Sequence, residues 1–258
     1  MKQPIIIQGA MEMEVCELLK IVNIEKEQIF CDTKFYEGKL DNYPVVISET
    51  QVGVINASIA TFLAIEKYNP CAIINQGIAG SHVPNIHKYD IIIGEKCVNI
   101  NSFITGVKNK TEGSNPMEWL FDQRSIEYHC NQRLLESAKS MTFPNTNIFF
   151  GTIGSGDIFN REVDRIEWIH KKKNTLCEDN ESIALYNICD RFNIPCIGIR
   201  TITNNEITQT ESDGSTVTRL DLNKNSNRII SQKHDLTPAK QSQQFVIEYV
   251  KKLIKSFN

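Results

Sequence analysis

Residues 73–81, IINQGIAGS, decide the fold of this chain. Their apolar start belongs to a run over residues 71–74 that shows no alternation, and Gly77 and Gly80 follow at once. An unbroken apolar run is typical of a strand covered on both faces, and the glycines after it mark a turn where backbone approaches a neighbour or a ligand closely. The sequence predicts the central strand of a helix-flanked sheet, ending in a turn that is a candidate floor for a site. From these residues alone, a tight strand-to-loop corner is the simpler explanation.

The length and composition bound the class of protein. A chain of 258 residues can form one large α/β domain or two small ones, and because no linker divides it we expect a single domain over residues 1–258. The formal net charge of -3 gives no electrostatic footprint for nucleic acid, and no apolar run reaches the length of a membrane span. The apolar run at the amino terminus is too short for a signal-peptide core. We therefore expect a cytoplasmic protein with no nucleic-acid and no membrane partner.

The eight cysteines are scattered, without Cys-x-x-Cys pairs or a histidine at zinc-site spacing. Most of them lie in apolar runs, where a reduced cysteine packs as a small hydrophobic residue. We therefore predict no metal site and no disulfide.

The first predicted strand, residues 4–8, runs through a Gly-Ala turn into a helix that carries three glutamates in its opening turns. These are Glu12, Glu14 and Glu17. Negative charge near a helix N-terminus is favoured by the helix dipole, which is explanation enough for two of the three. In α/β folds, ligands also bind outside the carboxyl ends of the strands, so one of these acids can face a ligand.

Strands and helices alternate along the rest of the chain. The pattern predicts a hairpin of strands at 29–38 and 43–49, a helix at 54–68, a strand at 90–93 followed by extended chain at 97–104, a helix at 132–140, a strand at 147–152, a charged helix at 160–173, a helix ending at 189–192 and a strand at 195–202. Residues 106–130 are the least regular part and are interpreted as an insertion loop, although a lid or a subunit contact would fit too. This order predicts an α/β fold around a mixed sheet.

Four separated segments together resemble the nucleoside phosphorylase/nucleosidase superfamily. They are GAMEME at 9–14, NQGIAG at 75–80, GSGDIF at 154–159 and DNESIA at 179–184. The resemblance spans nearly the whole chain and is closest to the methylthioadenosine/S-adenosylhomocysteine nucleosidases, which hydrolyse the bond between adenine and ribose. It implies a single three-layer α/β/α domain with a central mixed twisted sheet, a small-molecule purine nucleoside and water as substrates, no cofactor, and a homodimer.

Breaking an N-glycosidic bond passes through an oxocarbenium-like sugar, so the site must activate a water, hold the ribose hydroxyls and stabilise the departing base. By position, the resemblance implies that Glu14 activates the water, that Glu181 binds the ribose hydroxyls and that Asn180 adds a polar ribose-binding group beside them. The alternative for Glu181 is a helix-start carboxylate. The resemblance assigns the purine side to Phe159, Asn160, Ser155 and Asn204. The alternative for Phe159, which would stack on the purine, is an aromatic core residue.

Two positions favour hydrolysis over phosphorolysis. In the related hexameric phosphorylases an arginine before the central glycine segment binds phosphate, and here Asn75 occupies that position. A hydroxyl residue that follows in many relatives is replaced by Ile78, which with Gly77 would line the nucleophile pocket. Water is therefore the favoured nucleophile, and a purine nucleoside phosphorylase is the alternative enzyme.

Asn204 is the main departure from the family pattern, because relatives usually carry an aspartate that protonates the purine N7 or hydrogen-bonds to it. An amide can donate a hydrogen bond to N7 but is not a general acid. Losing one general acid costs a factor of about 10² to 10⁴, which predicts a slower or altered enzyme. A non-catalytic nucleoside-binding or storage protein stays open as a second alternative.

Overall fold

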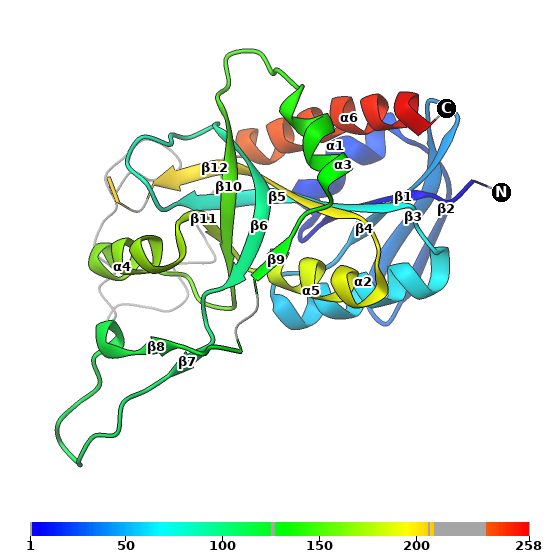
Figure 1. The fold of residues 1–258 in the computed structure, drawn as a ribbon. Coiled ribbons are helices and arrows are strands. Elements are labelled where there is room, and N and C mark those ends of the chain that lie inside the picture. The colour runs from blue at the N-terminus through cyan, green and yellow to red at the C-terminus, as the bar shows by residue number, and fades with distance from the viewer. Residues whose placement is uncertain (1, 125–126, 206, 209–235, 258) are drawn as a thin grey trace.

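Figure 1 shows the computed structural model, which describes residues 2–124, 127–205, 207–208 and 236–257. The strands of the main sheet are β1 (Ile5–Gly9), β2 (Asn23–Phe30), β3 (Thr33–Leu40), β4 (Tyr43–Glu49), β5 (Ala72–Ser81), β6 (Ile91–Asn99), β9 (Glu127–His129), β10 (Ile148–Ser155), β11 (Thr175–Asp179) and β12 (Cys196–Asn205). Their order is β11-β10-β6-β12-β5-β1-β4-β3-β2, with β9 paired to β6. Parallel and antiparallel pairs both occur, so the predicted mixed sheet is confirmed.

The strand β5 holds the sheet together, as its sequence predicts. It pairs in parallel with β1 on one side and with β12 on the other, and its last residues also pair with β11. Because β11, β10, β6 and β12 are themselves joined in that order, the extra β11–β5 pairing closes these five strands into a ring. Residues from distant parts of the chain therefore meet at the end of β5.

Helices cover both faces of the sheet. They are α1 (Glu12–Ile21), α2 (Val54–Tyr68), α3 (Gln132–Lys139), α4 (Val163–Lys173), α5 (Ser182–Phe192) and α6 (Thr237–Phe257). Helices α1, α3 and α6 lie together on one face, α2 and α5 lie on the other, and α4 lies beside β11 (Figure 1). This is the predicted three-layer arrangement. Within the described ranges, no helix combines the length and the apolar character needed to cross a bilayer.

The unbroken apolar runs are buried on both faces, which explains why they do not alternate. In β1, Ile5 and Ile7 pack into the core under α1 and α6, whereas Ile6 packs into the core under α2 and α5. In β5, Ile74 and Ile73 divide between the two cores in the same way. Each strand residue thus contributes to one of two hydrophobic cores.

The predicted turn after the central strand is wrong, because β5 continues through both glycines to Ser81. The strand is longer since β12 pairs with it from Ile73 to Ser81, with Gly77 opposite Arg200 and Gly80 opposite Asn204. Gly77 is needed for a close approach between this strand and α1. A Cβ on Gly77 would lie 2.5 Å from the Glu14 Oε1 atom.

Other boundaries differ from the prediction. The strand expected at 29–38 is two strands, because Cys31 and Asp32 form a turn with φ of 48° and 59° between β2 and β3. The expected hairpin is present between β3 and β4. The strand predicted at 90–93 continues without a break to Asn99 in β6. Residues 103–129 contain short elements: β7 (Phe103–Ile104) paired with β8 (Leu120–Phe121), the 3₁₀ helix η1 (Pro116–Glu118) and β9.

Candidate active site

The four segments singled out in the sequence converge at one end of the sheet. The strands β1, β5 and β12 are parallel neighbours, so their carboxyl ends lie side by side. The strand β11 reaches the same place by pairing with β5 at Gly80 and Ser81. Helices α1 and α5 begin just after β1 and β11, which brings Glu14 and Glu181 to this end of the sheet.

Of the three glutamates in α1, Glu14 alone is buried. Its Oε2 atom accepts hydrogen bonds from the backbone N–H groups of Ala10 at 2.7 Å and Met11 at 3.2 Å, and Oε1 accepts one from Ile78 at 3.0 Å. Burial raises the pKa of Glu14, against the lowering effects of Arg200 and of these donors. A carboxylate held in this way keeps a fixed orientation and has a raised proton affinity.

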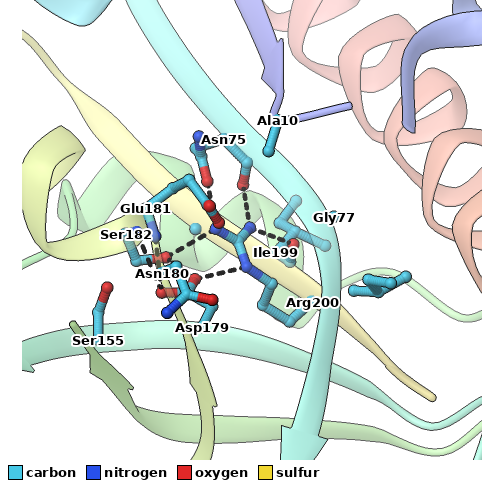
Figure 2. A network of polar contacts seen from close by, with 12 residues as sticks. Ala10, Asn75, Gly77, Ser155, Asp179, Asn180, Glu181, Ser182, Ile199 and Arg200 are labelled. Carbon is cyan, nitrogen blue, oxygen red and sulfur yellow. Dashed lines mark hydrogen bonds and ion pairs between the residues drawn. The ribbon is translucent and has the colours of Figure 1, made fainter. Parts of the chain in front are cut away.

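Arg200, on β12, is the centre of the polar network drawn in Figure 2. Its Nε donates to Asp179 at 2.5 Å, and its terminal nitrogens donate to the Ile199 carbonyl at 2.8 Å and to Ser182 Oγ at 2.9 Å. Asn75 accepts two more of its hydrogen bonds, at its backbone carbonyl and at its side-chain oxygen. All five guanidinium N–H groups therefore bind protein acceptors.

The positive charge of the buried Arg200 offsets the negative charges of the carboxylates around it. Although burial lowers it, the pKa of Arg200 is raised by Asp179, Glu181 and Glu14. Sequence reasoning gave no role to Arg200 or Asp179. The available signal was a charged residue inside an otherwise apolar strand, since such a residue is almost never fully buried without a partner.

Glu181 is the first residue before α5, yet its side chain does not cap that helix. Its Oε1 atom accepts a hydrogen bond from the Gly53 backbone N–H at 3.0 Å, at the start of α2. Burial, with the Asp179 and Glu14 carboxylates, raises the pKa of Glu181 to about 8. Glu181 is therefore a helix-start carboxylate, as in the alternative, but the backbone N–H that it binds belongs to the N-cap residue of α2 and not to its own helix.

On the predicted purine side, Phe159 is 74% exposed, so the alternative of an aromatic core residue is wrong. Asn160 is buried, and both its backbone N–H and its side-chain NH₂ donate to the Glu178 carboxylate, at 2.8 and 2.6 Å. Ser155 is buried too, and its Oγ accepts the Ile183 N–H at 3.0 Å. Ser155 and Asn160 thus fix the loop on which Phe159 lies.

The two asparagines of the prediction have different surroundings. Asn180 is buried, and its side-chain nitrogen donates to the Gly156 carbonyl, next to the loop that carries Phe159. Asn204 lies over Gly80, where its Nδ2 is 3.4 Å from the position that a Cβ would occupy. Its Oδ1 accepts a hydrogen bond from Thr203 Oγ1 at 2.6 Å. The structure therefore places Asn204 at the end of β5, on the same rung as Gly80.

Comparison with known proteins extends this description. The family model of the phosphorylase superfamily matches residues 4–231. A 5'-methylthioadenosine/S-adenosylhomocysteine nucleosidase of Staphylococcus haemolyticus is 33% identical over 196 residues, which are 75% of this chain and 83% of that protein. Among solved structures, a Neisseria meningitidis nucleosidase of this type in complex with methylthio-immucillin-A has a TM-score of 0.76 at 24% identity, covering 96% of this chain and 99% of its own. An aspartate-to-asparagine mutant of the Helicobacter pylori enzyme with 5'-methylthioadenosine in its active site has a TM-score of 0.77 at 19% identity, covering 98% and 100%.

Proposed function

The chain belongs to the phosphorylase superfamily, in its 5'-methylthioadenosine/S-adenosylhomocysteine nucleosidase branch, and on this premise we propose that it hydrolyses the N-glycosidic bond of a purine nucleoside of that type. The products are the free base and a ribose derivative. The observation that carries the proposal is the meeting of two buried carboxyl groups with raised pKa, Glu14 and Glu181, at the end of the central strands.

In this proposal Glu14 is the general base that activates water. A general base works best when its pKa lies near the working pH, and burial moves the pKa of Glu14 in that direction. The backbone N–H of Ala10 donates to Oε2 of Glu14, and the backbone N–H of Ile78, on β5, donates to Oε1. This support orients the carboxylate without using a side chain that the reaction would need.

Glu181 supplies the ribose contact. Its carboxyl group would hydrogen-bond the 2' and 3' hydroxyls, and in its ionised form, above the raised pKa of about 8, its negative charge would favour the cationic sugar that develops in the transition state. Asp179 is unsuited to this role because it pairs with Arg200 and accepts the Ser182 hydroxyl. Arg200 in turn offsets the charge that three neighbouring acids would otherwise place in one buried region.

Water is the nucleophile because phosphate would find little to bind. A phosphate subsite needs a cation or a fork of N–H donors. The N–H groups of Arg200 are occupied by protein acceptors, Asn75 is one of those acceptors, and Ile78 offers only an apolar side chain. The hydrogen-bond network of Arg200 therefore disfavours a phosphorylase role.

The purine would lie over Gly80, between Phe159 and the end of β12. An exposed aromatic ring on a fixed loop is suited to stacking on a base. Asn204 would donate a hydrogen bond from Nδ2 to N7, which stabilises the leaving base without protonating it. If this hydrogen bond were too weak for catalysis, the protein would bind nucleosides without cleaving them. That outcome is the non-catalytic alternative described above.

One assay separates these functions. Free base is measured by chromatography after incubation with 5'-methylthioadenosine, S-adenosylhomocysteine, adenosine, inosine and guanosine, each with and without phosphate. Base release that does not depend on phosphate supports the proposal. Release that requires phosphate would make the protein a phosphorylase, and nucleoside binding without any release would make it a binding protein.

We also propose that the 258 residues form one domain, that the protein is cytoplasmic and that it forms a homodimer. The outer face of α2 supports the dimer, because Ile55, Ile59 and Phe62 are 71%, 44% and 43% exposed and recur at helical spacing. Phe192 on α5, 39% exposed, packs its ring 5.8 Å from that of Phe62. An apolar patch of this kind is typical of an interface between protein subunits.

A further inference from the structure

A buried glutamine of α6 binds the backbone of the first turns of α1. Gln243 is fully buried, and its Oε1 atom accepts the backbone N–H groups of Glu17 at 2.7 Å and Leu18 at 3.2 Å. Its Nε2 atom donates to the Met13 carbonyl at 2.8 Å and to the Ala239 carbonyl of its own helix at 3.0 Å. Two acceptor and two donor positions are the full capacity of an amide, so this side chain is held in one orientation.

A second glutamine, on β5, binds the same part of α1 from the sheet. The side-chain nitrogen of Gln76 donates to the Glu14 backbone carbonyl. Within the described part of the chain this is the only hydrogen bond of that side chain, and its Oε1 atom is buried without a partner. Burying an amide with an unpaired oxygen is unfavourable. The Glu14 carbonyl therefore accounts for the presence of an amide at this position.

Together the two amides bind four backbone groups that a regular α-helix would join in pairs. In such a helix the N–H of Glu17 donates to the carbonyl of Met13. The next N–H, of Leu18, donates to the carbonyl of Glu14. Here each of these four groups binds a glutamine side chain from α6 or β5. Side chains that insert into this ladder open or bend a helix, so the first turn of α1 takes its position from α6 and β5.

This position matters because the Glu14 carboxylate binds donors on two elements. It accepts N–H groups at the start of α1, and it accepts the Ile78 N–H of β5 at 3.0 Å. It can reach all of these donors only while the first turn of α1 keeps its place beside β5. Helix α6 also contacts β5 here, since the buried Ser242 donates from Oγ to the Gly77 carbonyl at 3.3 Å. Residues 242–243 thus hold both elements that support the carboxylate.

We propose that Gln243 and Gln76 are positioning residues for the reaction, which hold the first turn of α1 where the Glu14 carboxylate reaches its donors. The inference rests on the proposed function, because it takes Glu14 as the base that activates water. The contact between α1 and α6 is otherwise part of a hydrophobic core, to which Val15 and Phe245 belong. An apolar side chain would pack there without a buried amide, so the hydrogen bonds of glutamine, and not its packing, distinguish it.

The test compares Gln243→Met with Gln244→Met. Methionine is similar in length to glutamine but makes none of these hydrogen bonds, and Gln244 is the exposed neighbour on the same helix. With 5'-methylthioadenosine as the substrate, Gln243→Met should lower kcat at least about tenfold and leave KM nearly unchanged. The reason is that a misplaced base slows the chemical step and not the binding of the nucleoside. Gln244→Met should match the wild type in both constants.

A second readout follows the contact of Glu14 directly and needs no turnover. A backbone N–H that donates to a carboxylate makes a strong hydrogen bond, which moves its amide proton resonance to lower field. The Ile78 resonance therefore reports whether Glu14 still binds that N–H. It should move to higher field in Gln243→Met and stay in place in Gln244→Met. If the wild type releases no base, the proposed function is wrong, and this resonance alone then decides on the positioning role.

Gln76→Met takes the place of Gln243→Met if the latter does not fold, and the same two changes are expected of it. A folded variant with the kcat of the wild type overturns the proposal. So does a variant that loses rate while the Ile78 resonance stays in place, because the loss would then not act through Glu14.

Discussion

At Glu14, three backbone N–H groups from two elements hold a carboxylate whose pKa is raised by burial. A glutamine here has one oxygen to accept these hydrogen bonds, and its NH₂ group would face an N–H donor where the second carboxylate oxygen lies. Substitution by glutamine therefore removes the charge and one hydrogen-bond acceptor while it keeps the size of the side chain.

We predict that Glu14→Gln keeps its fold but releases base about 10² to 10⁴ times more slowly, the usual loss when a general base is removed. Single-turnover base release and circular dichroism together measure this. The control Glu17→Gln changes a residue of the same helix whose carboxylate pairs with Lys20. Wild-type rates in Glu14→Gln would show that this carboxylate does not activate water.

Glu181 predicts a pH dependence of stability. Burial raises its pKa from 4.5 to about 8, so the folded protein keeps a proton that the unfolded chain releases above its ordinary value. The stability due to this proton is complete below pH 4.5 and is lost as the pH rises through about 8. The thermal midpoint of the wild type should therefore fall across this range, and that of Glu181→Gln should fall less. Parallel pH profiles for the two proteins would contradict the assignment.

At the scale of the elements, α1 and β5 meet at a contact that leaves no space for a side chain. A Cβ on Gly77 would lie 2.5 Å from Glu14 Oε1, whereas one on Gly106 would have no heavy atom within 4 Å. We predict that Gly77→Ala displaces the Glu14 carboxylate and lowers kcat at least about tenfold, since small misplacements of reacting groups are costly. Gly106→Ala is the matched control and should be neutral. Steady-state kinetics of both variants give the answer, and equal kcat values would be inconsistent with this contact.

Arg200 joins β12 to β5, β11 and the start of α5. In Arg200→Met the partner Asp179 would be buried without its counter-charge, which costs about 3 to 5 kcal/mol of unfolding free energy. The control Arg124→Met breaks an exposed pair with Asp122 and should change stability little. Urea unfolding of the two variants measures the difference. A small loss in Arg200→Met would mean that the network adds little to the stability of the sheet.

The same elements explain what the sequence could and could not predict. Residues 5–7 and 73–74 are apolar without alternation because helices cover both faces of their strands, and this local pattern sufficed to predict the layers. The extension of β5 to Ser81 depends on pairing with β12, more than a hundred residues away, and no local signal records it. Turn residues at positive φ, Cys31 and Asp32, were missed because neither is a glycine.

Part of the candidate site could also be predicted from the sequence, and part could not. Glu14 and Glu181 were found through short motifs, and the structure places both at the end of the central strands. Arg200 was missed as a component of the candidate site, since its importance comes from its partner Asp179 on β11. Motifs predict candidate residues for contact with a ligand, whereas the groups that hold those residues become visible only once the sheet is assembled.

For the whole molecule, the dimer proposed on the outer face of α2 leads to a direct prediction. Placing a charge on the apolar patch with Ile59→Glu should shift the protein toward the monomer, because burying an unpaired carboxylate in an interface is unfavourable. Light scattering after size-exclusion chromatography measures the mass. The control Lys20→Glu changes an exposed residue of α1, a helix of the opposite face. A mass that Ile59→Glu leaves unaltered would place the interface elsewhere or show that the protein is a monomer.

We propose that this chain breaks an N-glycosidic bond with water as the nucleophile. The most direct measurement is the reaction of 5'-methylthioadenosine in ¹⁸O-labelled water without phosphate, with mass spectrometry of the sugar product. Hydrolysis predicts free base together with a methylthioribose that carries one ¹⁸O atom at C1, and loss of this product in Glu14→Gln. A sugar that forms only when phosphate is added, and then as the 1-phosphate, would contradict it.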